Sequence, residues 1–262
     1  MTSLIRTVFK PSAARVARDP RPIRAWTLAI ASGVLVSLAS VVMMATGLCT
    51  AFAARRLYRG MARGVALAIL GLYGIRLRVD APEPLPQRQT VFVSNHTSSL
   101  DLFVLVALGL PDCRFFLSGF LRRLLPLGAI AWLLGTFFTV PQDRPAERVR
   151  IFERAERILR RTGESVYLSP EGERITSGGP GHFNKGAFHL ATNLGAPIVP
   201  FYICIPATVD PRLGFDARPG VIDVHFLPAI DTRTWTLAAL DSNVALVRDQ
   251  LVRLHEDLSC AA

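Results

Sequence analysis

The feature that most constrains this chain is a stretch of 29 residues without a charged side chain, from Trp26 to Ala54. A helix needs only about 20 apolar residues to cross the hydrocarbon core of a bilayer. The stretch follows a long basic leader, and it far exceeds the roughly 7–15 residues of a signal-peptide core. We therefore expect an uncleaved membrane anchor. A cleaved signal peptide is the alternative, because Ala51-Phe52-Ala53 resembles a cleavage site.

The positive charge of the chain is concentrated around this stretch. Residues 1–80 hold twelve Arg or Lys and two acidic residues, a balance of +10, whereas residues 81–262 hold eighteen of each sign. Basic charge beside an apolar stretch favours contact with anionic lipid over contact with nucleic acid, and we expect no nucleic-acid partner. Arginines flank both ends of the stretch, so the positive-inside rule does not fix an orientation. A re-entrant helical pair is therefore an alternative to a simple span.

Two further segments suggest how the chain is divided. The apolar run from Val65 to Ile75 is too short to span a membrane, and it fits a helix that lies in the interface or packs on the catalytic domain. The proline-rich segment 81–86 is typical of an extended linker. We predict a basic N-terminal segment (1–24), a membrane anchor with an interfacial helix (25–80) and a catalytic domain (81–262).

After the linker, short apolar strands alternate with helical segments. This alternation predicts an α/β domain in which helices flank a central sheet. We expect strands at 89–94, 114–117, 137–140, 165–168, 198–205 and 221–227, and helices at 100–110, 121–134, 146–161, 185–194 and 236–258.

The four cysteines are scattered and form no Cys-x-x-Cys motif. We expect reduced, buried thiols at Cys49, Cys113, Cys204 and Cys260.

A histidine stands at the end of the first of these strands, and an aspartate follows it five residues later. Across a tight strand-to-helix turn, Asp101 can bind Nδ1 of His96 and leave Nε2 free to take a proton from a hydroxyl. No Gly-x-Ser-x-Gly motif is present, so the nucleophile is more plausibly a hydroxyl of the substrate. The alternative is that Asp101 only caps the helix, because Ser98 to Asp101 fits a capping box.

Two further blocks suit an anionic group. In Ser169-Pro170-Glu171-Gly172-Glu173-Arg174 a proline and a glycine impose a turn, and the planar guanidinium of Arg174 suits phosphate. The glycine-rich segment 178–188 leads into a helix N-terminus, where Lys185 and the backbone would favour an anion. Each block taken alone also fits an ordinary surface turn or loop, and His182 more plausibly supports its loop than takes part in chemistry.

Together, these blocks resemble the phosphate acyltransferase family typified by bacterial 1-acylglycerol-3-phosphate acyltransferase. Its Asn-His-x4-Asp block is similar to residues 95–101, its Phe-Pro-Glu-Gly-Thr-Arg block to 169–174, its Phe-Lys-Lys-Gly-Ala block to 183–187, and its Pro-Ile-Val-Pro strand to 197–200. The four blocks follow one another in the family order.

The resemblance implies a glycerolipid acyltransferase fold, with a mixed central sheet flanked by helices and an N-terminal membrane-associated helical segment. It implies a membrane-bound enzyme of phospholipid biosynthesis that moves a fatty acyl group from acyl-CoA or acyl-ACP to the hydroxyl of a lysophospholipid such as 1-acylglycerol-3-phosphate. It further implies membrane lipids as partners, no metal and no cofactor beyond the acyl donor. The location would be the bacterial inner membrane, with the catalytic domain facing the cytoplasm.

Residue roles follow from the same resemblance. His96 with Asp101 would activate the acceptor hydroxyl, and Arg174 would lie near the phosphate. The full set of expected substrate-binding residues is Asn95, Arg122, Arg144, Glu171, Gly172, Arg174 and Lys185.

The chain departs from the family pattern on the headgroup side. Glu173 stands where the family usually has threonine, and Ser118 and Gly119 stand where it has a lysine, with Arg122 and Arg123 as the nearest cations. A different acceptor, such as a lyso-ornithine lipid, is therefore one alternative function. A catalytically silent lipid-binding membrane protein is another. A secreted or periplasmic hydrolase is least favoured, because the chain lacks a nucleophile motif and disulfide spacing.

Overall fold

The computed structural model describes residues 22–175, 179–211, 214 and 216–259. A seven-stranded sheet with the order β1-β7-β6-β2-β5-β3-β4 forms its centre. The run from β6 to β4 is parallel, whereas β7 is antiparallel to β6 and parallel to β1. The strands are β1 (Ile75–Asp80), β2 (Val91–Ser94), β3 (Cys113–Ser118), β4 (Phe137–Thr139), β5 (Ser165–Leu168), β6 (Ile198–Cys204) and β7 (Gly220–Phe226).

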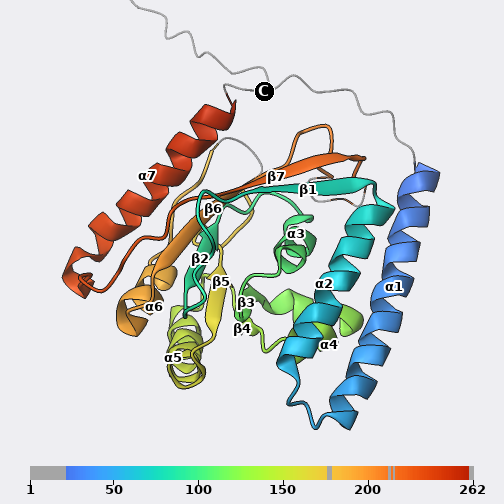
Figure 1. Cartoon of the computed structure of the whole chain (residues 1–262), viewed down its shortest axis with the longest axis horizontal. Helices are drawn as coiled ribbons and strands as arrows, with labels where there is room; N and C mark the ends of the chain where they lie inside the picture. The colour runs from blue at the N-terminus through green and yellow to red at the C-terminus, as the bar shows by residue number, and fades with distance from the viewer. Residues whose placement is uncertain (1–21, 176–178, 212–213, 215, 260–262) are drawn as a thin grey trace, which may run out of the picture.

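Helices cover both faces of this sheet (Figure 1). Alternation along β2 shows why two layers are needed: Phe92 packs into the hydrophobic core on one face, and Val91 and Val93 pack into the core on the other. The predicted α/β class with a mixed sheet is confirmed. One layer holds α1 (Pro22–Cys49), α2 (Arg55–Leu72), α3 (Asp101–Leu108) and α4 (Leu125–Leu133). The other layer holds α5 (Pro145–Thr162), α6 (Gly186–Leu194) and α7 (Leu240–Ser259). Short 3-10 helices, η1 (Gly119–Arg123) and η2 (Leu237–Ala239), precede α4 and α7.

Strand β1 was not predicted from the sequence. The apolar run expected to be helical as far as Ile75 ends at Leu72, and Gly74, with a φ of +71°, turns the chain into β1. Apolar and charged residues then alternate along β1, which pairs with β7. The linker at 81–86 therefore joins two strands of one sheet, and the sheet begins on the N-terminal side of the boundary expected after residue 80.

Helices α1 and α2 form a hairpin that packs on the domain. Helix α1 is the one helix in the described part of the chain that is long and apolar enough to cross a membrane. Val36 and Met43 on one face of it are buried, whereas Trp26 and Ile30 are more than 60% exposed (68% and 63%). The buried face of α2 contacts α3. Of the two alternatives for the second apolar segment, packing on the domain is therefore the one observed.

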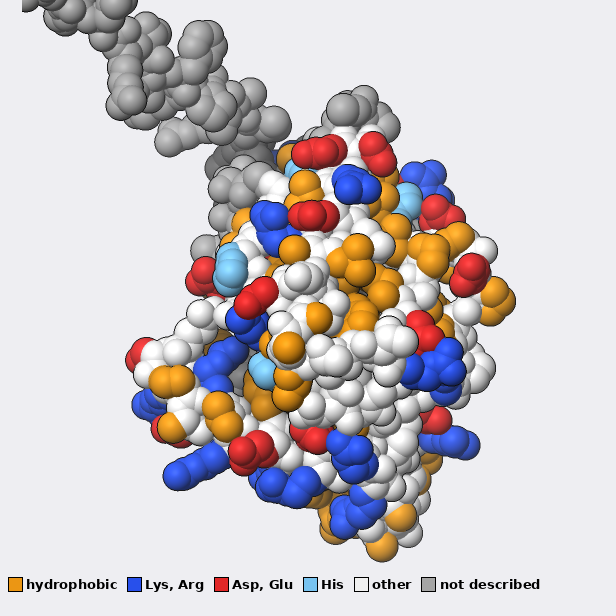
Figure 2. All heavy atoms as spheres, turned by 90° about the vertical axis from the view of Figure 1, so that its left-hand side faces the viewer, with side chains coloured by type: hydrophobic (Ala, Val, Ile, Leu, Met, Phe, Trp, Pro, Cys, Tyr) orange, Lys and Arg blue, Asp and Glu red, His pale blue; other side chains and the backbone are white. Residues whose placement is uncertain are grey.

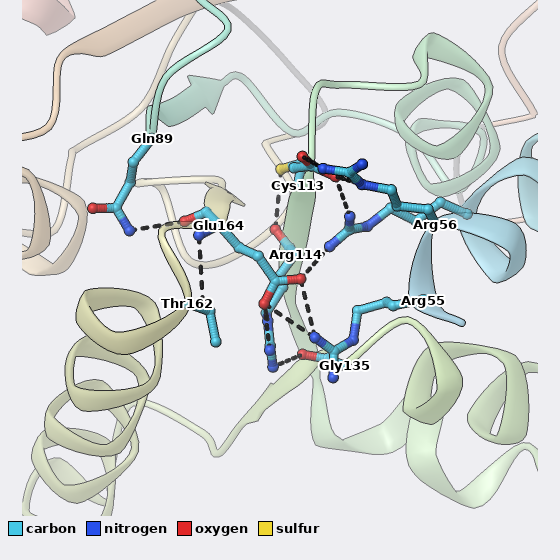
Figure 3. Close-up of polar contacts among 10 residues, drawn as sticks. Arg55, Arg56, Gln89, Cys113, Arg114, Gly135, Thr162 and Glu164 are labelled. Carbon is cyan, nitrogen blue, oxygen red and sulfur yellow. Dashed lines mark hydrogen bonds and ion pairs between the residues drawn. The ribbon is translucent and has the colours of Figure 1, made fainter. Parts of the chain in front are cut away.

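An ion cluster fastens this hairpin to the sheet (Figure 3). Arg55 and Arg59 of α2 and Arg114 of β3 converge on Glu164, and Arg55 Nη1 lies 3.1 Å from Glu164 Oε1. Burial alone would raise the pKa of Glu164, but hydrogen bonding and the charges of Arg114 and Arg55 outweigh it and hold that pKa below its ordinary value. Glu164 precedes β5, so the cluster lies at the edge of the sheet where β5 begins.

Three of the predicted thiols, Cys49, Cys113 and Cys204, are free cysteines, and Cys113 is buried while Cys49 is exposed. Cys260, most of the basic segment 1–24 and Gly178 of the glycine-rich segment lie outside the described residues.

Candidate active site

The candidate site lies at the carboxyl edge of the parallel strands. Strands β2 and β5 are parallel neighbours, so the loops that follow Ser94 and Leu168 leave the sheet on the same side. His96 lies in the first of these loops and Glu171 in the second. This edge is where open α/β sheets usually hold their ligands.

His96 and Asp101 form a hydrogen-bonded pair. His96 Nδ1 lies 2.7 Å from Asp101 Oδ2, and the backbone N–H groups of Thr97 and Ser98 donate to the same oxygen at 2.8 and 3.0 Å. Asp101 therefore both caps the turn and holds the histidine, so the two interpretations drawn from the sequence describe one arrangement.

The environment of the pair fixes what each ring nitrogen can do. Asp101 is fully buried, whereas the side chain of His96 is 34% exposed. An ionised carboxylate only accepts hydrogen bonds, so Nδ1 carries the proton that points to Asp101. Nε2 is the nitrogen left to act on a substrate hydroxyl.

Glu171 supports His96 from inside the protein. It is 3% exposed, and its two oxygens accept the backbone N–H groups of His96, at 2.7 Å, and Gly181, at 2.9 Å. Burial raises the pKa of Glu171, and the two N–H donors oppose but do not cancel that effect. The structure therefore shows Glu171 bound to the backbone through both of its oxygens.

Asn95 is buried against the neighbouring strand β6. Its side chain is 1% exposed, its amide nitrogen donates to the carbonyl of Ile203 at 3.0 Å, and its amide oxygen accepts the N–H of Ile203 at 2.8 Å. Both ends of the amide are therefore occupied by β6. Asn95 therefore fixes the start of the His96 loop against β6.

Gly172 and Arg174 lie in the turn that follows β5. Gly172 has a φ of +73°, and a Cβ atom there would lie 2.9 Å from Asn184 Nδ2, so the turn requires glycine. The backbone N–H of Ile175 donates to the carbonyl of His96 at 2.8 Å. The exposed residue Arg174, next in sequence to Ile175, therefore lies beside the His96 loop.

The remaining expected residues lie on other elements. Arg122 is exposed on η1, which follows β3, and Arg144 is exposed just before α5. Lys185 Nζ forms an ion pair with Asp241 at 2.6 Å. Within the described part of the chain, no hydrogen bond or ion pair joins these three side chains to His96. The structure thus brings Arg174 close to the histidine and leaves the other three cations farther along the sheet edge or in α7 contacts.

The loop between β6 and β7 contributes residues that the sequence did not reveal. Ser98 Oγ donates to Asp210 Oδ1 at 2.6 Å, and Ser99 Oγ donates to the carbonyl of Gly214 at 3.1 Å. These contacts hold the loop on the turn that follows His96. Asp210 follows the histidine by more than a hundred residues and belongs to no motif, so no sequence pattern could have placed it here.

Known proteins resemble this chain in sequence and in fold. The profile of the Acyltransferase family matches residues 76–204. The chain is 28% identical over 200 residues to the 1-acyl-sn-glycerol-3-phosphate acyltransferase of Limnanthes douglasii, a match that covers 71% of this chain and 65% of that protein. It is 31% identical over 195 residues to the mouse 1-acyl-sn-glycerol-3-phosphate acyltransferase alpha, covering 72% of this chain and 66% of that protein. The chain therefore spans about two thirds of the length of these relatives.

Among solved structures, the 1-acyl-sn-glycerophosphate (LPA) acyltransferase PlsC of Thermotoga maritima shares this fold. The TM-score is 0.76 at 19% sequence identity, and the match covers 92% of this chain and 98% of that one. At this level of identity, the likeness concerns the fold.

Proposed function

Since the chain belongs to the glycerolipid acyltransferase family, we propose that it transfers a fatty acyl group from a thioester to the free hydroxyl of a lysophospholipid such as 1-acylglycerol-3-phosphate. The observation that carries this proposal is the hydrogen bond between His96 and the buried Asp101 at the carboxyl edge of the sheet. The same pair argues against a catalytically silent lipid-binding protein, because such a protein has no need of a braced histidine.

The reaction proceeds through general base catalysis. Nε2 of His96 takes the proton of the acceptor hydroxyl while that oxygen attacks the thioester carbonyl, and Asp101 stabilises the resulting imidazolium. The tetrahedral intermediate then collapses. The C–S bond breaks, and the leaving thiolate receives the proton from His96. The products are the ester and the free thiol of coenzyme A or acyl carrier protein, so no further cofactor is required.

An apolar cavity beside α3 can hold a short part of an acyl chain. It has a volume of about 60 Å³ and lies between helices α1 to α4 and strand β3. Leu102 and Phe103 line it, and they directly follow Asp101 in α3. Because α3 carries Asp101 as well as these two lining residues, we assign the cavity to the part of the acyl chain that is near the thioester.

The headgroup side of the site rests on Arg174. This exposed guanidinium lies beside the His96 loop and suits a phosphate. Glu173 is exposed next to it, and in phosphate binding it would pair with Arg174 or repel the anion. Glu173 is the observation that keeps a second acceptor class, a lysolipid without a phosphate such as a lyso-ornithine lipid, as the alternative.

The position of α1 favours a hairpin held in one leaflet. At its start, Arg24 Nη1 donates to the carbonyl of Ala217 at 3.0 Å, and just after its end Phe52 contacts Trp132 of α4, with ring centroids 5.2 Å apart. A helix that touches the domain at both ends cannot cross the bilayer without drawing the domain into the hydrocarbon. We therefore favour the re-entrant alternative over the simple span.

Exposed apolar side chains also lie on η1 and at the start of α4, and α4 packs against the hairpin. Phe120 and Leu125, on η1 and at the start of α4, are 63% and 82% exposed, and Arg122 and Arg123 lie between them. Apolar tips flanked by arginines suit the headgroup region of an anionic membrane. This placement gives Arg122 a lipid-contacting role in place of the expected substrate contact. By contrast, charged side chains of both signs are spread over the face formed by α5 to α7 (Figure 2), which suits contact with water.

One experiment tests both the reaction and the acceptor. Purified protein is assayed against a panel of lysolipids, with and without a phosphate headgroup, using acyl-CoA and acyl-ACP as donors. We expect thioester-dependent acylation that is abolished in His96→Ala, with an unchanged circular dichroism spectrum. Turnover retained in His96→Ala would refute the base assignment. Exclusive use of phosphate-free acceptors would favour the alternative substrate.

A further inference from the structure

Helix α7 packs firmly on the domain although it lies outside the segment that matches the family profile. Its buried residues Leu240, Val244, Val247 and Leu251 belong to the core between α5, α6 and the sheet. The spacing of these residues places them on one face of the helix. Helix α7 is thus a rigid element, and polar side chains next to this face are held in place with it.

One of these polar side chains is Arg248, which binds the glycine-rich loop. Arg248 Nε donates to the carbonyl of Gly181 at 2.7 Å, and Nη2 donates to the carbonyl of Pro180 at 3.1 Å. The N–H of Gly181 in turn donates to Glu171, and Glu171 accepts the N–H of His96. An unbroken series of hydrogen bonds therefore runs from the C-terminal helix to the backbone of the catalytic histidine.

We propose that Arg248 is a positioning residue for the catalytic histidine, acting through Gly181 and Glu171. This inference rests on the proposed acyl transfer and deepens it. Arg248 touches no substrate. It holds the peptide whose N–H orients the Glu171 carboxylate, and that carboxylate holds the backbone of His96 at the end of β2.

The composition of the loop explains why it needs an external brace. Gly179 and Gly181 have no side chains of their own to restrict the backbone, so the loop has a wide choice of conformations. An arginine fork fixes two successive carbonyls at once, which a lysine with a single ammonium group does less well. A second contact from α7 lies close by: a Cβ atom on Gly179 would meet the His255 ring at 2.7 Å, and that ring is hydrogen-bonded to Tyr202.

The series of hydrogen bonds also links Arg248 to the loss of acyl transfer activity at low pH, which is the acid limb of the pH–activity profile. Burial raises the pKa of Glu171, the N–H groups of Gly181 and His96 lower it, and of the neighbouring charges His96 lowers it and Asp101 raises it. If the contacts with Arg248 are lost and the N–H of Gly181 no longer reaches Glu171, the pKa of Glu171 rises further. Glu171 then takes up its proton at a higher pH. Protonated Glu171 cannot accept both N–H groups, so activity should be lost at a higher pH as the solution is acidified.

The test compares Arg248→Met, Arg248→Lys and a matched control, Arg253→Met, at an exposed position of the same helix. Each full-length variant is assayed for acyl transfer with the lysolipid and thioester that the parent uses, from pH 5 to 9, after its melting temperature has been measured. For Arg248→Met we expect kcat/KM to fall by about 10- to 100-fold, the usual effect of a small displacement of catalytic groups. The acid limb should move to higher pH, Arg248→Lys should be intermediate, and Arg253→Met should match the parent.

A double-mutant cycle with Glu171→Gln separates positioning from simple stability. If Arg248 acts through Glu171, adding Arg248→Met to Glu171→Gln should cause little further loss. Additive losses, or an Arg248→Met variant with a lower melting temperature but the parent's kcat and acid limb, would overturn the inference. The proposed function fails separately, if the parent itself transfers no acyl group to any lysolipid.

Discussion

Replacing Glu164 with glutamine tests whether the ion cluster holds the α1–α2 hairpin on the α/β domain. The side chains of Arg114 and Arg59 are only 8% and 16% exposed, so both guanidinium groups would lose a partner inside the protein. Breaking a buried ion pair costs about 3–5 kcal/mol. The low end applies here, because Arg59 keeps its ion pair with Asp112 at 2.7 Å and because Arg55 is 35% exposed.

For a domain of this size, about 3 kcal/mol corresponds to a fall in melting temperature of about 6–12 °C. This fall is measured by thermal unfolding of the parent and of Glu164→Gln in detergent, monitored by near-UV circular dichroism. The matched control is Glu156→Gln, whose partner Arg160 is 59% exposed and which should change stability by less than about 1 kcal/mol. If the two variants melt within about 2 °C of each other, the cluster does not act as a clamp.

The same carboxylate gives the clamp a predictable pH dependence. The pKa of Glu164 is lower in the folded protein than in the unfolded chain. Its contribution is therefore complete above the unfolded value of about 4.3 and is lost as the pH falls through the lower folded value. The parent should lose melting temperature below about pH 4, and the part of that loss due to Glu164 should be missing in Glu164→Gln.

Three other changes test the candidate site and the proposed membrane contact. Asp101→Asn should lower kcat by about 10²- to 10⁴-fold while the protein stays folded, because the imidazolium loses its counter-charge, and a kcat near that of the parent would contradict the pairing. Gly172→Ala should reduce stability by about 1–3 kcal/mol in thermal unfolding, since its φ is positive and its Cβ would crowd Asn184, whereas Gly60→Ala, in open space on α2, should not destabilise. Replacing Phe120 and Leu125 together with serine should weaken co-sedimentation with anionic vesicles, and unchanged binding would exclude this segment from the membrane contact.

Short apolar runs were sufficient to predict most of the strands, because the strands of a parallel sheet are buried on both faces. β2, β5 and β6 stand out as short apolar runs between turn residues, and the structure confirms each of them. β1 was missed although Ile75, Leu77 and Val79 alternate with charged residues. Its start was absorbed into the apolar run of α2, and its partner β7 lies about 145 residues away, beyond the reach of any local pattern.

The sequence by itself indicated the pairing of His96 with Asp101, because the two residues are separated by a single turn, although it left open that Asp101 only caps the helix. It also determined the apolar character of α1. The tertiary structure decided which polar residues of the motifs bind the backbone and which stay exposed. Asn95 and Glu171 belong to the motifs, but Asn95 is hydrogen-bonded to β6 and Glu171 to the glycine-rich loop. Arg248 belongs to no motif, yet it reaches this loop, because only folding brings a helix that begins at residue 240 against a loop at residue 181.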